Sequence, residues 1–218
     1  MDKSFLCSDT HPQKRDLINR YFFGGRVLDI GCGSGQYASY YKHASSVIQI
    51  DMFDRRLEQF RTNPFLIADL NKALPDVGEF DLILAFDIME HLDHDEAFLE
   101  WAYRCLSAKG YFLLSVPNRD WEILKPVWLT HAHFTDKTHR REYEKNDLIS
   151  LLTKHGFQIA EYIEYENHAL LHAGSLLAKN NVPAKLAAKS IFLLMKVYKS
   201  LGLFNRKIIP DHFIVVKK

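Results

Sequence analysis

Cysteine is scarce in this 218-residue chain, and long apolar runs are missing from it. The three cysteines, Cys7, Cys32 and Cys105, are odd in number and form no Cys-x-x-Cys pair, which argues against a disulfide framework and favours a reducing compartment. No apolar run is longer than that of residues 191–195, whereas a transmembrane helix needs about 20 residues. The N-terminus lacks the apolar core of about 7–15 residues that a signal peptide has. We therefore expect a cytoplasmic protein that does not cross a bilayer.

The nicotinamide fingerprint Gly-x-Gly-x-x-Gly is also missing, because Gln36 stands where its last glycine would be. Instead, an apolar strand that contains Asp29 runs into a turn with glycine at three alternate positions, 31, 33 and 35. Glycine there permits a tight turn, a positive φ and a close approach of the backbone to a ligand. Residues 36–41 are predicted to begin a helix whose first N–H groups face that ligand.

Several further apolar segments are predicted to be strands, and the next three end in acids, Asp51, Asp69 and Asp87. Helical stretches are predicted between the strands, which is typical of a parallel sheet with helices on both faces. Ligands of such sheets lie outside the carboxyl ends of the strands, where these acids fall. The predicted strands cover residues 47–51, 65–70, 80–87, 110–118, 157–163 and 212–216.

The segment Asp-x-Gly-x-Gly-x-Gly and the acids after it resemble the ordered motifs of class I S-adenosylmethionine (SAM)-dependent methyltransferases, over roughly residues 24–165. The resemblance implies an α/β fold: a Rossmann-like, doubly wound, seven-stranded sheet whose last strand is antiparallel. It also implies SAM as cofactor and S-adenosylhomocysteine as product. Asp51 would bind the ribose diol and Asp69 the adenine amino group. The residues assigned to the cofactor are Asp29, Gly31, Cys32, Gly33, Gly35, Asp51, Met52, Asp69, Leu70 and Phe86.

The chain looks most similar to the branch that methylates small molecules, quinones and sugars. That branch carries a Glu-His-Leu-like segment after the fourth strand, here residues 88–92, and a Val-Pro-Asn-like end of the fifth strand, here residues 116–118. The Asn/Asp-Pro-Pro-Tyr/Phe motif of enzymes that methylate amino groups of nucleic acids is missing after the fourth strand. The resemblance therefore implies an oxygen acceptor.

A hydroxyl acceptor needs a general base or a metal ion that lowers its pKa. Histidines after the fourth and fifth predicted strands are the candidates: His91, His94, His131, His133 and His139. We expect Glu90, His91 and His139 to border the acceptor site as catalytic residues.

The same region offers a candidate metal set of Asp87, Glu90, His91 and His139, with the residue types of a hard-to-borderline metal site. It resembles the Glu-x-x-Glu-His…His arrangement of small-RNA 2′-O-methyltransferases, with Asp87 in place of the first glutamate. The plainer interpretation is that Glu90 and His91 shape the cofactor pocket or cap a helix. RNA fits poorly, because three basic residues of this region are offset by three acids: Lys137, Arg140 and Arg141 against Asp136, Glu142 and Glu144.

We predict a single domain with an N-terminal helix (residues 16–23 of the segment 1–23), a core (24–167 and 208–218) and a helical insertion (168–207) between strands six and seven. Charge is divided unevenly: residues 1–167 hold 19 basic and 26 acidic residues, and residues 168–218 hold 9 basic residues and one acid. Within the insertion, helices are predicted over 168–179 and 184–203.

The second predicted helix places four lysines beside a broad apolar face: Lys185, Lys189, Lys196 and Lys199. Such a helix suits the inner face of a membrane, or equally packing on the protein.

Three functions are compatible with these features of the sequence. The first is O-methylation of a small-molecule, sugar or lipid-linked acceptor. The second is metal-assisted methylation of RNA, and the third is a non-catalytic SAM-binding subunit. The intact glycine loop and strand-end acids argue against the third, because an inactive relative is free to lose them. The oligomeric state and the identity of the acceptor do not follow from the sequence.

Overall fold

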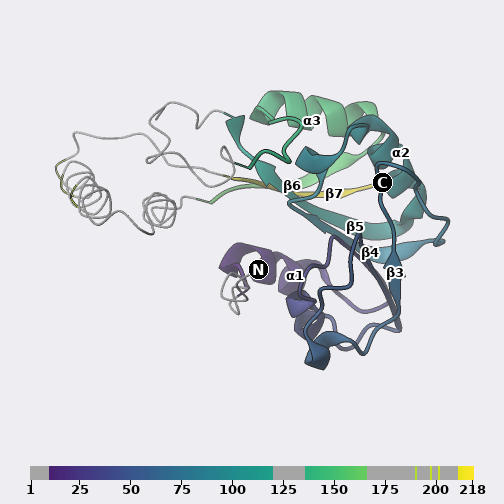
Figure 1. Ribbon diagram of the computed structural model, residues 1–218. Helices are drawn as coiled ribbons and strands as arrows, with labels where there is room; N and C mark the ends of the chain where they lie inside the picture. The colour runs from purple at the N-terminus through teal and green to yellow at the C-terminus, as the bar shows by residue number, and fades with distance from the viewer. Residues whose placement is uncertain (1–9, 120–135, 166–189, 191–196, 198–200, 202–210) are drawn as a thin grey trace.

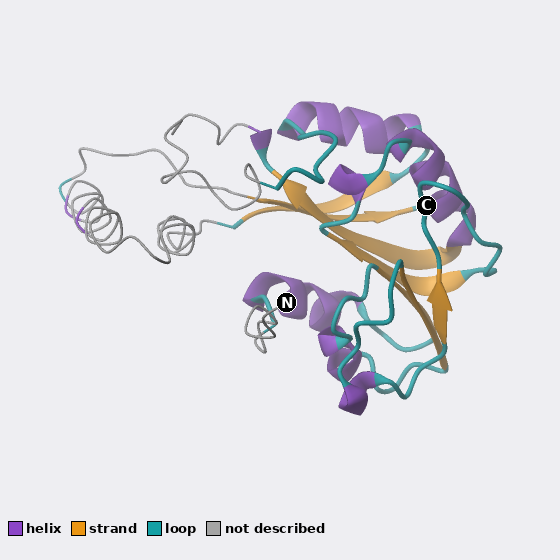
Figure 2. Cartoon of the chain, viewed as in Figure 1, coloured by secondary structure: helices purple, strands orange, loops and turns teal. Residues whose placement is uncertain are grey.

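A seven-stranded mixed sheet forms the centre of the protein (Figures 1 and 2). The computed structural model describes residues 10–119, 136–165, 190, 197, 201 and 211–218. The strand order is β3-β2-β1-β4-β5-β7-β6. Strands β1 to β5 pair in parallel, whereas β7 is antiparallel to both β5 and β6. The strands are β1 (Arg26–Ile30), β2 (Ser46–Asp51), β3 (Phe65–Ile67), β4 (Phe80–Phe86), β5 (Leu106–Pro117), β6 (Gln158–Glu164) and β7 (Asp211–Lys217).

Helices cover both faces of the sheet. Helix α1 (Pro12–Tyr21) lies on one face, and α2 (Asp95–Cys105) and α3 (Lys145–Lys154) lie on the other (Figure 1). Side chains of β4 alternate between two apolar clusters, because successive strand residues point to opposite faces. Leu82 and Leu84 pack on the α1 side, and Ile83 and Ala85 pack with α2 and α3.

Two elements, α1 and β5, begin four residues earlier than predicted, and each has a local cause. Pro12 stands in the first turn of α1, and the His11 side chain accepts a hydrogen bond from the Gln13 N–H, so the helix begins there rather than at residue 16. It ends at Tyr21, two residues before the predicted end. The fifth strand begins at Leu106, four residues earlier than predicted, because its first residues still pair with β4 at Phe80.

The predicted class of fold is confirmed, including the antiparallel last strand, but the prediction of helices between all strands is wrong. Residues 36–40 form a 3-10 helix, and residues 58–60 form another. Between β3 and β4 the described chain contains turns and no helix. These links are short and carry Pro64, Pro75 and Gly78, which favour turns over an α-helix.

The predicted helical insertion, residues 168–207, lies outside the described residues except at positions 190, 197 and 201. The Leu201 N–H donates to the Val197 carbonyl at 3.0 Å, and both side chains are exposed, 45% for Val197 and 65% for Leu201. Among the described residues, no helix has the length and apolar character that a membrane span requires.

Candidate functional site

The glycine loop lies between the carboxyl ends of β1 and β2. The N–H groups of Gly31 and Cys32 donate to the Ile50 carbonyl, at 2.7 and 3.2 Å, so the loop is held across the adjacent strand. Gly31 has a φ of 67°, and a Cβ atom added to it would lie 1.9 Å from Cδ1 of Ile88. Gly33 has a φ of 55°, and a Cβ atom added to it would make only an ordinary contact, 3.9 Å from the Gly31 carbonyl oxygen. Conformation therefore favours glycine at both positions, and at 31 a larger residue would also have to displace the Ile88 side chain.

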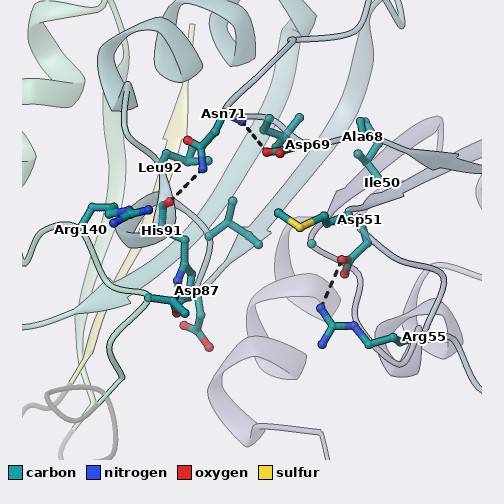
Figure 3. A pocket seen from close by; sticks show the side chains of 15 residues that line it. Ile50, Asp51, Arg55, Ala68, Asp69, Asn71, Asp87, His91, Leu92 and Arg140 are labelled. Atoms are coloured by element: carbon teal, nitrogen blue, oxygen red, sulfur yellow. Dashed lines mark hydrogen bonds and ion pairs between the residues drawn. The ribbon is translucent and has the colours of Figure 1, made fainter.

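Asp51, at the end of β2, faces this loop. Its Oδ2 accepts a hydrogen bond from the Gly33 N–H at 2.9 Å, and its Oδ1 accepts one from the Phe53 N–H at 3.4 Å. Arg55 lies 3.8 Å from Oδ1, with its own side chain 64% exposed (Figure 3). The carboxylate is thus oriented by two backbone donors and has one solvent-facing counter-charge.

A cavity of about 580 Å³ opens beside these residues, at the carboxyl ends of β1 to β4. Five of the ten residues predicted to contact the cofactor line it: Gly31, Asp51, Met52, Asp69 and Leu70. The other lining residues are Ile50, Arg55, Ala68, Asn71, Asp87, Ile88, His91, Leu92, Thr138 and Arg140. The cavity therefore lies at the sheet edge where the order of strands reverses between β1 and β4, the usual ligand position in such sheets.

Asp69 follows β3 on the cavity wall. Its carboxylate accepts hydrogen bonds from the Asn71 N–H at 3.1 Å and from Lys72 Nζ at 3.0 Å. The hydrogen bond from Lys72 lowers the pKa of Asp69, so this side chain is ionised at neutral pH. Asn71 reaches further, donating to the His91 carbonyl at 3.2 Å and accepting from the Asp93 N–H at 2.7 Å, and so joins the two walls of the cavity.

The remaining five predicted cofactor residues do not line the cavity. Asp29 is 2% exposed and turns toward the α1 face of the sheet, where burial raises its pKa to about 6. Cys32 is buried in the loop, and burial raises the pKa of its thiol. Phe86 packs on the α1 face beside Tyr37. Gly33 and Gly35 shape the loop through their positive φ, 55° and 74°.

Asp87 is the only residue other than glycine with positive φ, 57°, among the described residues. Its Oδ1 accepts a hydrogen bond from Ser115 Oγ at 2.6 Å, and its Oδ2 accepts one from Lys14 Nζ. Burial alone would lower the pKa of Lys14, but Asp87, together with Tyr37 and Asp211, outweighs it, and the pKa is raised. The sequence gives no sign of this role for Lys14, because a single lysine in an N-terminal helix has no motif that marks it.

The predicted catalytic residues Glu90, His91 and His139 come together. Their ligand atoms lie within 4.8 Å of one another, and the two imidazole rings are 4.7 Å apart. Asp87 is not part of this cluster; its carboxylate is engaged by Lys14 and Ser115 instead. Glu90 is fully buried, and the side chain of His139 is 8% exposed. The cluster therefore supplies a carboxylate and two imidazoles, without the fourth residue of the predicted set.

The segment 136–143 brings His139 to the cluster. The Arg140 N–H donates to the Glu90 carbonyl at 2.7 Å, and the Tyr143 hydroxyl donates to Asp95 Oδ2 at 3.0 Å. Arg141 pairs with Asp95 at the start of α2. Near the rings, Thr138 Oγ1 lies 3.0 Å from His91 Nδ1. Of the other candidate histidines, His94 precedes α2 and does not line the cavity, and His131 and His133 lie outside the described residues.

With this geometry established, comparison with known proteins assigns a family. The model of the family described as "Methyltransferase domain" matches residues 8–162, which include the glycine loop, the cavity and the whole cluster. The chain belongs to the methyltransferase-domain family. The match ends within β6, so β7 and the segment before it fall outside the matched region.

Relatives and solved structures agree with this family. The mitochondrial ubiquinone biosynthesis O-methyltransferase of Candida albicans is 31% identical over 54% of this chain and 39% of its own length. A probable S-adenosylmethionine-dependent methyltransferase of Mycolicibacterium smegmatis is 28% identical, with 71% and 62% covered. The chain thus spans less than two thirds of the length of either relative.

Two crystal structures have the same fold. A SAM-dependent methyltransferase from Archaeoglobus fulgidus superimposes with a TM-score of 0.61 at 21% identity, covering 94% of this chain and 91% of that one. An O-methyltransferase of a Brevibacillus brevis trans-AT PKS multienzyme, in complex with S-adenosylhomocysteine, superimposes with a TM-score of 0.60 at 16% identity, covering 94% and 71%. At these identities the likeness shows the fold of this methyltransferase domain.

The two glycines of the loop are expected to differ in their tolerance of alanine. Gly31→Ala combines a positive φ with a collision against Ile88 and should lower the free energy of unfolding by about 2–4 kcal/mol. Gly33→Ala meets no atom closer than 3.9 Å and should cost about 1 kcal/mol. Urea unfolding of both variants measures the difference, and equal losses would contradict the proposed contact between position 31 and Ile88.

Proposed function

We propose that the cavity binds SAM and that the chain transfers its methyl group to a hydroxyl oxygen of a small-molecule acceptor. The observation that carries the proposal is the position of Asp51: an oriented carboxylate at the end of β2, hydrogen-bonded to the glycine loop and lining the cavity. A carboxylate there can accept both hydrogen bonds of a ribose diol. The family match and the names of the relatives support the same function.

The residues present suit this cofactor. Asp51 would hold the ribose, Asp69 and Leu70 would line the adenine pocket, and the backbone of the glycine loop would approach the methionine part. Arg55 would have to share or release Asp51, and its exposed ion pair is weak enough for that. Asp29, Cys32, Gly33, Gly35 and Phe86 would act on the shape of the loop and its supporting strand, without lining the cavity.

Bound SAM supplies a methyl group on a positively charged sulfur. The protein has to hold the acceptor oxygen in line with that carbon, and such positioning can contribute about 7–11 kcal/mol to catalysis. The acceptor proton must leave, and His91 or His139 can accept it when neutral. Glu90, buried beside both rings, would stabilise an imidazolium once it forms.

A divalent metal ion is the alternative to a histidine base. Glu90, His91 and His139 have the donor types of borderline metals, and their ligand atoms are close enough to share one ion. Thr138 lies at Nδ1 of His91, and Asp136 lies 3.9 Å from Nε2 of His139, in the manner of partners that orient metal ligands. Such an ion would lower the pKa of the acceptor hydroxyl.

The oxygen acceptor follows from the relatives named as ubiquinone biosynthesis O-methyltransferases, whose length the chain matches only in part. We propose a small-molecule or lipid-linked acceptor and keep RNA as the second candidate, on the strength of the carboxylate–histidine cluster. RNA is less favoured because Arg140 and Arg141, the basic groups beside the cluster, pair with Asp93 and Asp95. A non-catalytic SAM-binding subunit would not need this cluster.

Asp51→Ala is expected to weaken binding of S-adenosylhomocysteine by about 100-fold, because a charged hydrogen-bond acceptor for the ribose is lost. The affinity of Asp51→Asn should lie between those of Asp51→Ala and the unaltered chain. Asp16 is an exposed acid on α1, and Asp16→Ala serves as the matched control. Isothermal titration calorimetry gives the affinities without knowledge of the acceptor. If Asp51→Ala binds as tightly as the unaltered chain, the cofactor site is misassigned.

The metal alternative makes a prediction that needs no acceptor either. Mn²⁺ titrated into the purified, chelator-treated protein should bind at one site, and His91→Ala and His139→Ala should each weaken binding by about 10-fold or more. His94→Ala is the control, because His94 lies outside the cluster. Absence of saturable Mn²⁺ binding would contradict the metal alternative, and the histidine base would then be the remaining mechanism. Mass spectrometry of products formed from SAM and fractionated lipid and polar cell extracts then identifies the acceptor class.

We further propose that residues 184–203 bring the enzyme to the inner face of a membrane, since the sequence puts four lysines beside an apolar face and Val197 and Leu201 are exposed. Each lysine near an anionic membrane surface contributes about 1 kcal/mol to the free energy of binding. Co-sedimentation should show binding to vesicles with phosphatidylserine and none to phosphatidylcholine alone. Replacing Lys185, Lys189, Lys196 and Lys199 with Glu should abolish it, and Lys42→Glu with Lys109→Glu should not. Equal binding to both vesicle types would contradict the proposal.

A further inference from the structure

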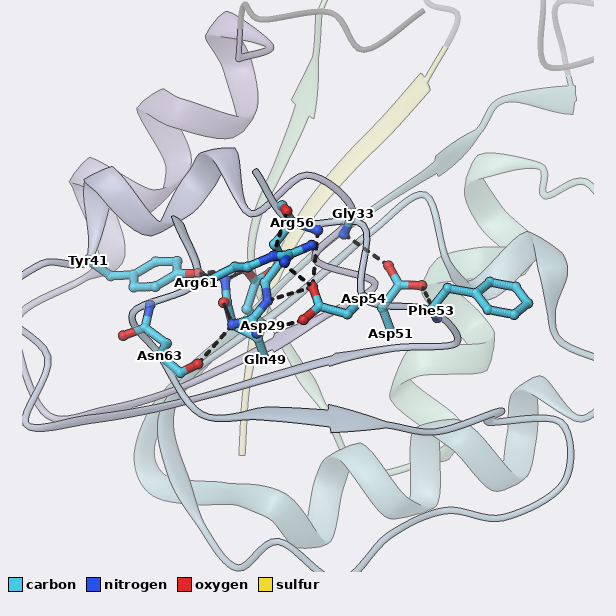
Figure 4. Close-up of polar contacts among 10 residues, drawn as sticks. All are labelled: Asp29, Gly33, Tyr41, Gln49, Asp51, Phe53, Asp54, Arg56, Arg61 and Asn63. Atoms are coloured by element: carbon cyan, nitrogen blue, oxygen red, sulfur yellow. Dashed lines mark hydrogen bonds and ion pairs between the residues drawn. The ribbon is translucent and has the colours of Figure 1, made fainter. Parts of the chain in front are cut away.

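A buried polar network lies beneath the glycine loop, on the face of the sheet away from the cavity wall. Four of its side chains are almost fully buried: Asp29 (2% exposed), Tyr41 (1%), Gln49 (0%) and Arg56 (6%). Asp54 joins them from the turn after β2 (Figure 4). Burying a guanidinium and a carboxylate in one small domain is costly unless each is fully hydrogen-bonded, so the network calls for an explanation.

The network runs without interruption from β1 to the turn after β2. Asp29 and Gln49 are register partners on adjacent strands, and Gln49 Nε2 donates to Asp29 Oδ2 at 3.2 Å. The Tyr41 hydroxyl donates to the same oxygen at 2.6 Å. Arg56 Nη1 then donates to Gln49 Oε1 at 3.0 Å, so the amide of Gln49 connects the buried acid to the buried base.

Arg56 closes the other end of the network. Its Nε and Nη2 donate to the two oxygens of Asp54 at 3.0 and 3.1 Å, and its Nη1 also donates to the Asn63 carbonyl at 2.8 Å. Its guanidinium lies over the ring of Phe65, the first residue of β3, 4.3 Å from the centroid. One side chain thus joins the turn after β2 to the beginning of β3.

The same side chain supports the glycine loop. A Cβ atom added to Gly35 would lie 3.3 Å from Arg56 Cγ, so the stem of Arg56 packs directly against the loop backbone. The next residue, Leu57, donates its N–H to the Ser34 carbonyl at 3.0 Å. The turn that carries Asp51 at its start and Arg56 near its end is therefore fastened to the loop at both ends, since Asp51 accepts from Gly33.

We propose that Arg56 is a positioning residue for cofactor binding: through Gln49, Asp54 and the glycine loop it holds Asp51 at the distance from Gly33 that the ribose requires. Arg56 does not line the cavity, so it would act through other residues rather than by contact with the ligand. The inference rests on the proposed function of Asp51. It extends that function to a set of residues, Arg56, Gln49, Tyr41 and Asp54, which the motifs of the sequence do not mark.

A double-mutant cycle separates positioning from a general effect on folding. Arg56→Met should weaken binding of S-adenosylhomocysteine by about 10-fold or more in the otherwise unaltered chain. In an Asp51→Ala background the same substitution should change affinity by less than about threefold, because the group that it positions is gone. Ligand-observed NMR at a temperature where every variant is folded gives all four affinities.

Arg56→Lys is the second variant, and it serves where Arg56→Met does not fold. It keeps the charge but cannot reproduce the planar fork of donors to Asp54 and Gln49, and we expect an intermediate loss of affinity. Arg104→Met, at an exposed position of α2, is the matched control and should bind normally. The positioning role is supported if Arg56→Lys binds S-adenosylhomocysteine more tightly than Arg56→Met and if the effect of Arg56→Met depends on the presence of Asp51.

Two results would overturn the inference. In one, Arg56→Met binds S-adenosylhomocysteine as tightly as the unaltered chain. In the other, Arg56→Met lowers the affinity by the same factor whether residue 51 is Asp or Ala, which means that Arg56 acts independently of the Asp51 carboxylate. A failure of the proposed function looks different, because then Asp51→Ala alone leaves the affinity unchanged.

Discussion

The hydrogen bond from the Gly33 amide to the Asp51 carboxylate joins the two chain segments on which the site depends. One segment is the loop after β1, with three glycines in left-handed conformations; the other is the turn after β2. Without this bond, the carboxylate would keep only the longer hydrogen bond from the Phe53 N–H and the exposed ion pair with Arg55. The buried network around Arg56 contacts both segments, which is the basis of its proposed positioning role.

Charge compensation is a second constraint on the cavity. Three carboxylates, Asp51, Asp69 and Asp87, face one concave space, and like charges would repel one another if none were paired. Each has a basic partner: Arg55, Lys72 and Lys14 respectively. The basic side chains of Arg55 and Lys72 are exposed, so these two pairs are weak, whereas Lys14 itself is buried. Each acid of the cavity wall is therefore paired with a basic group, and the pairs of Asp51 and Asp69 are the ones that a ligand can most easily displace.

The proposed acceptor side is built differently. Glu90 and His91 lie in a short 3-10 helix after β4 (Met89–His91), and His139 comes from a segment 48 residues beyond His91, so no single element carries the cluster. Backbone contact from Arg140 to Glu90 and the side chains of Arg141 and Tyr143 on Asp95 hold that segment in place. Binding and catalytic residues are often carried by loops of this kind, held in place by a rigid sheet.

Local patterns in the sequence were enough to predict the class of fold and to select five residues that the structure places on the cavity wall. Strand alternation, glycine spacing and strand-end acids are local properties that survive in any parallel sheet. The sequence also singled out Glu90, His91 and His139 as a group.

The direction in which each acid points became known only from the folded chain: Asp29 lies on the α1 side, where Tyr41 and Gln49 donate hydrogen bonds to it. The fold likewise brings Lys14, from the first helix, to Asp87 and so removes that acid from the predicted metal set. Such contacts join residues far apart in the chain, and no periodicity records them, because they depend on how the elements pack rather than on how each one forms.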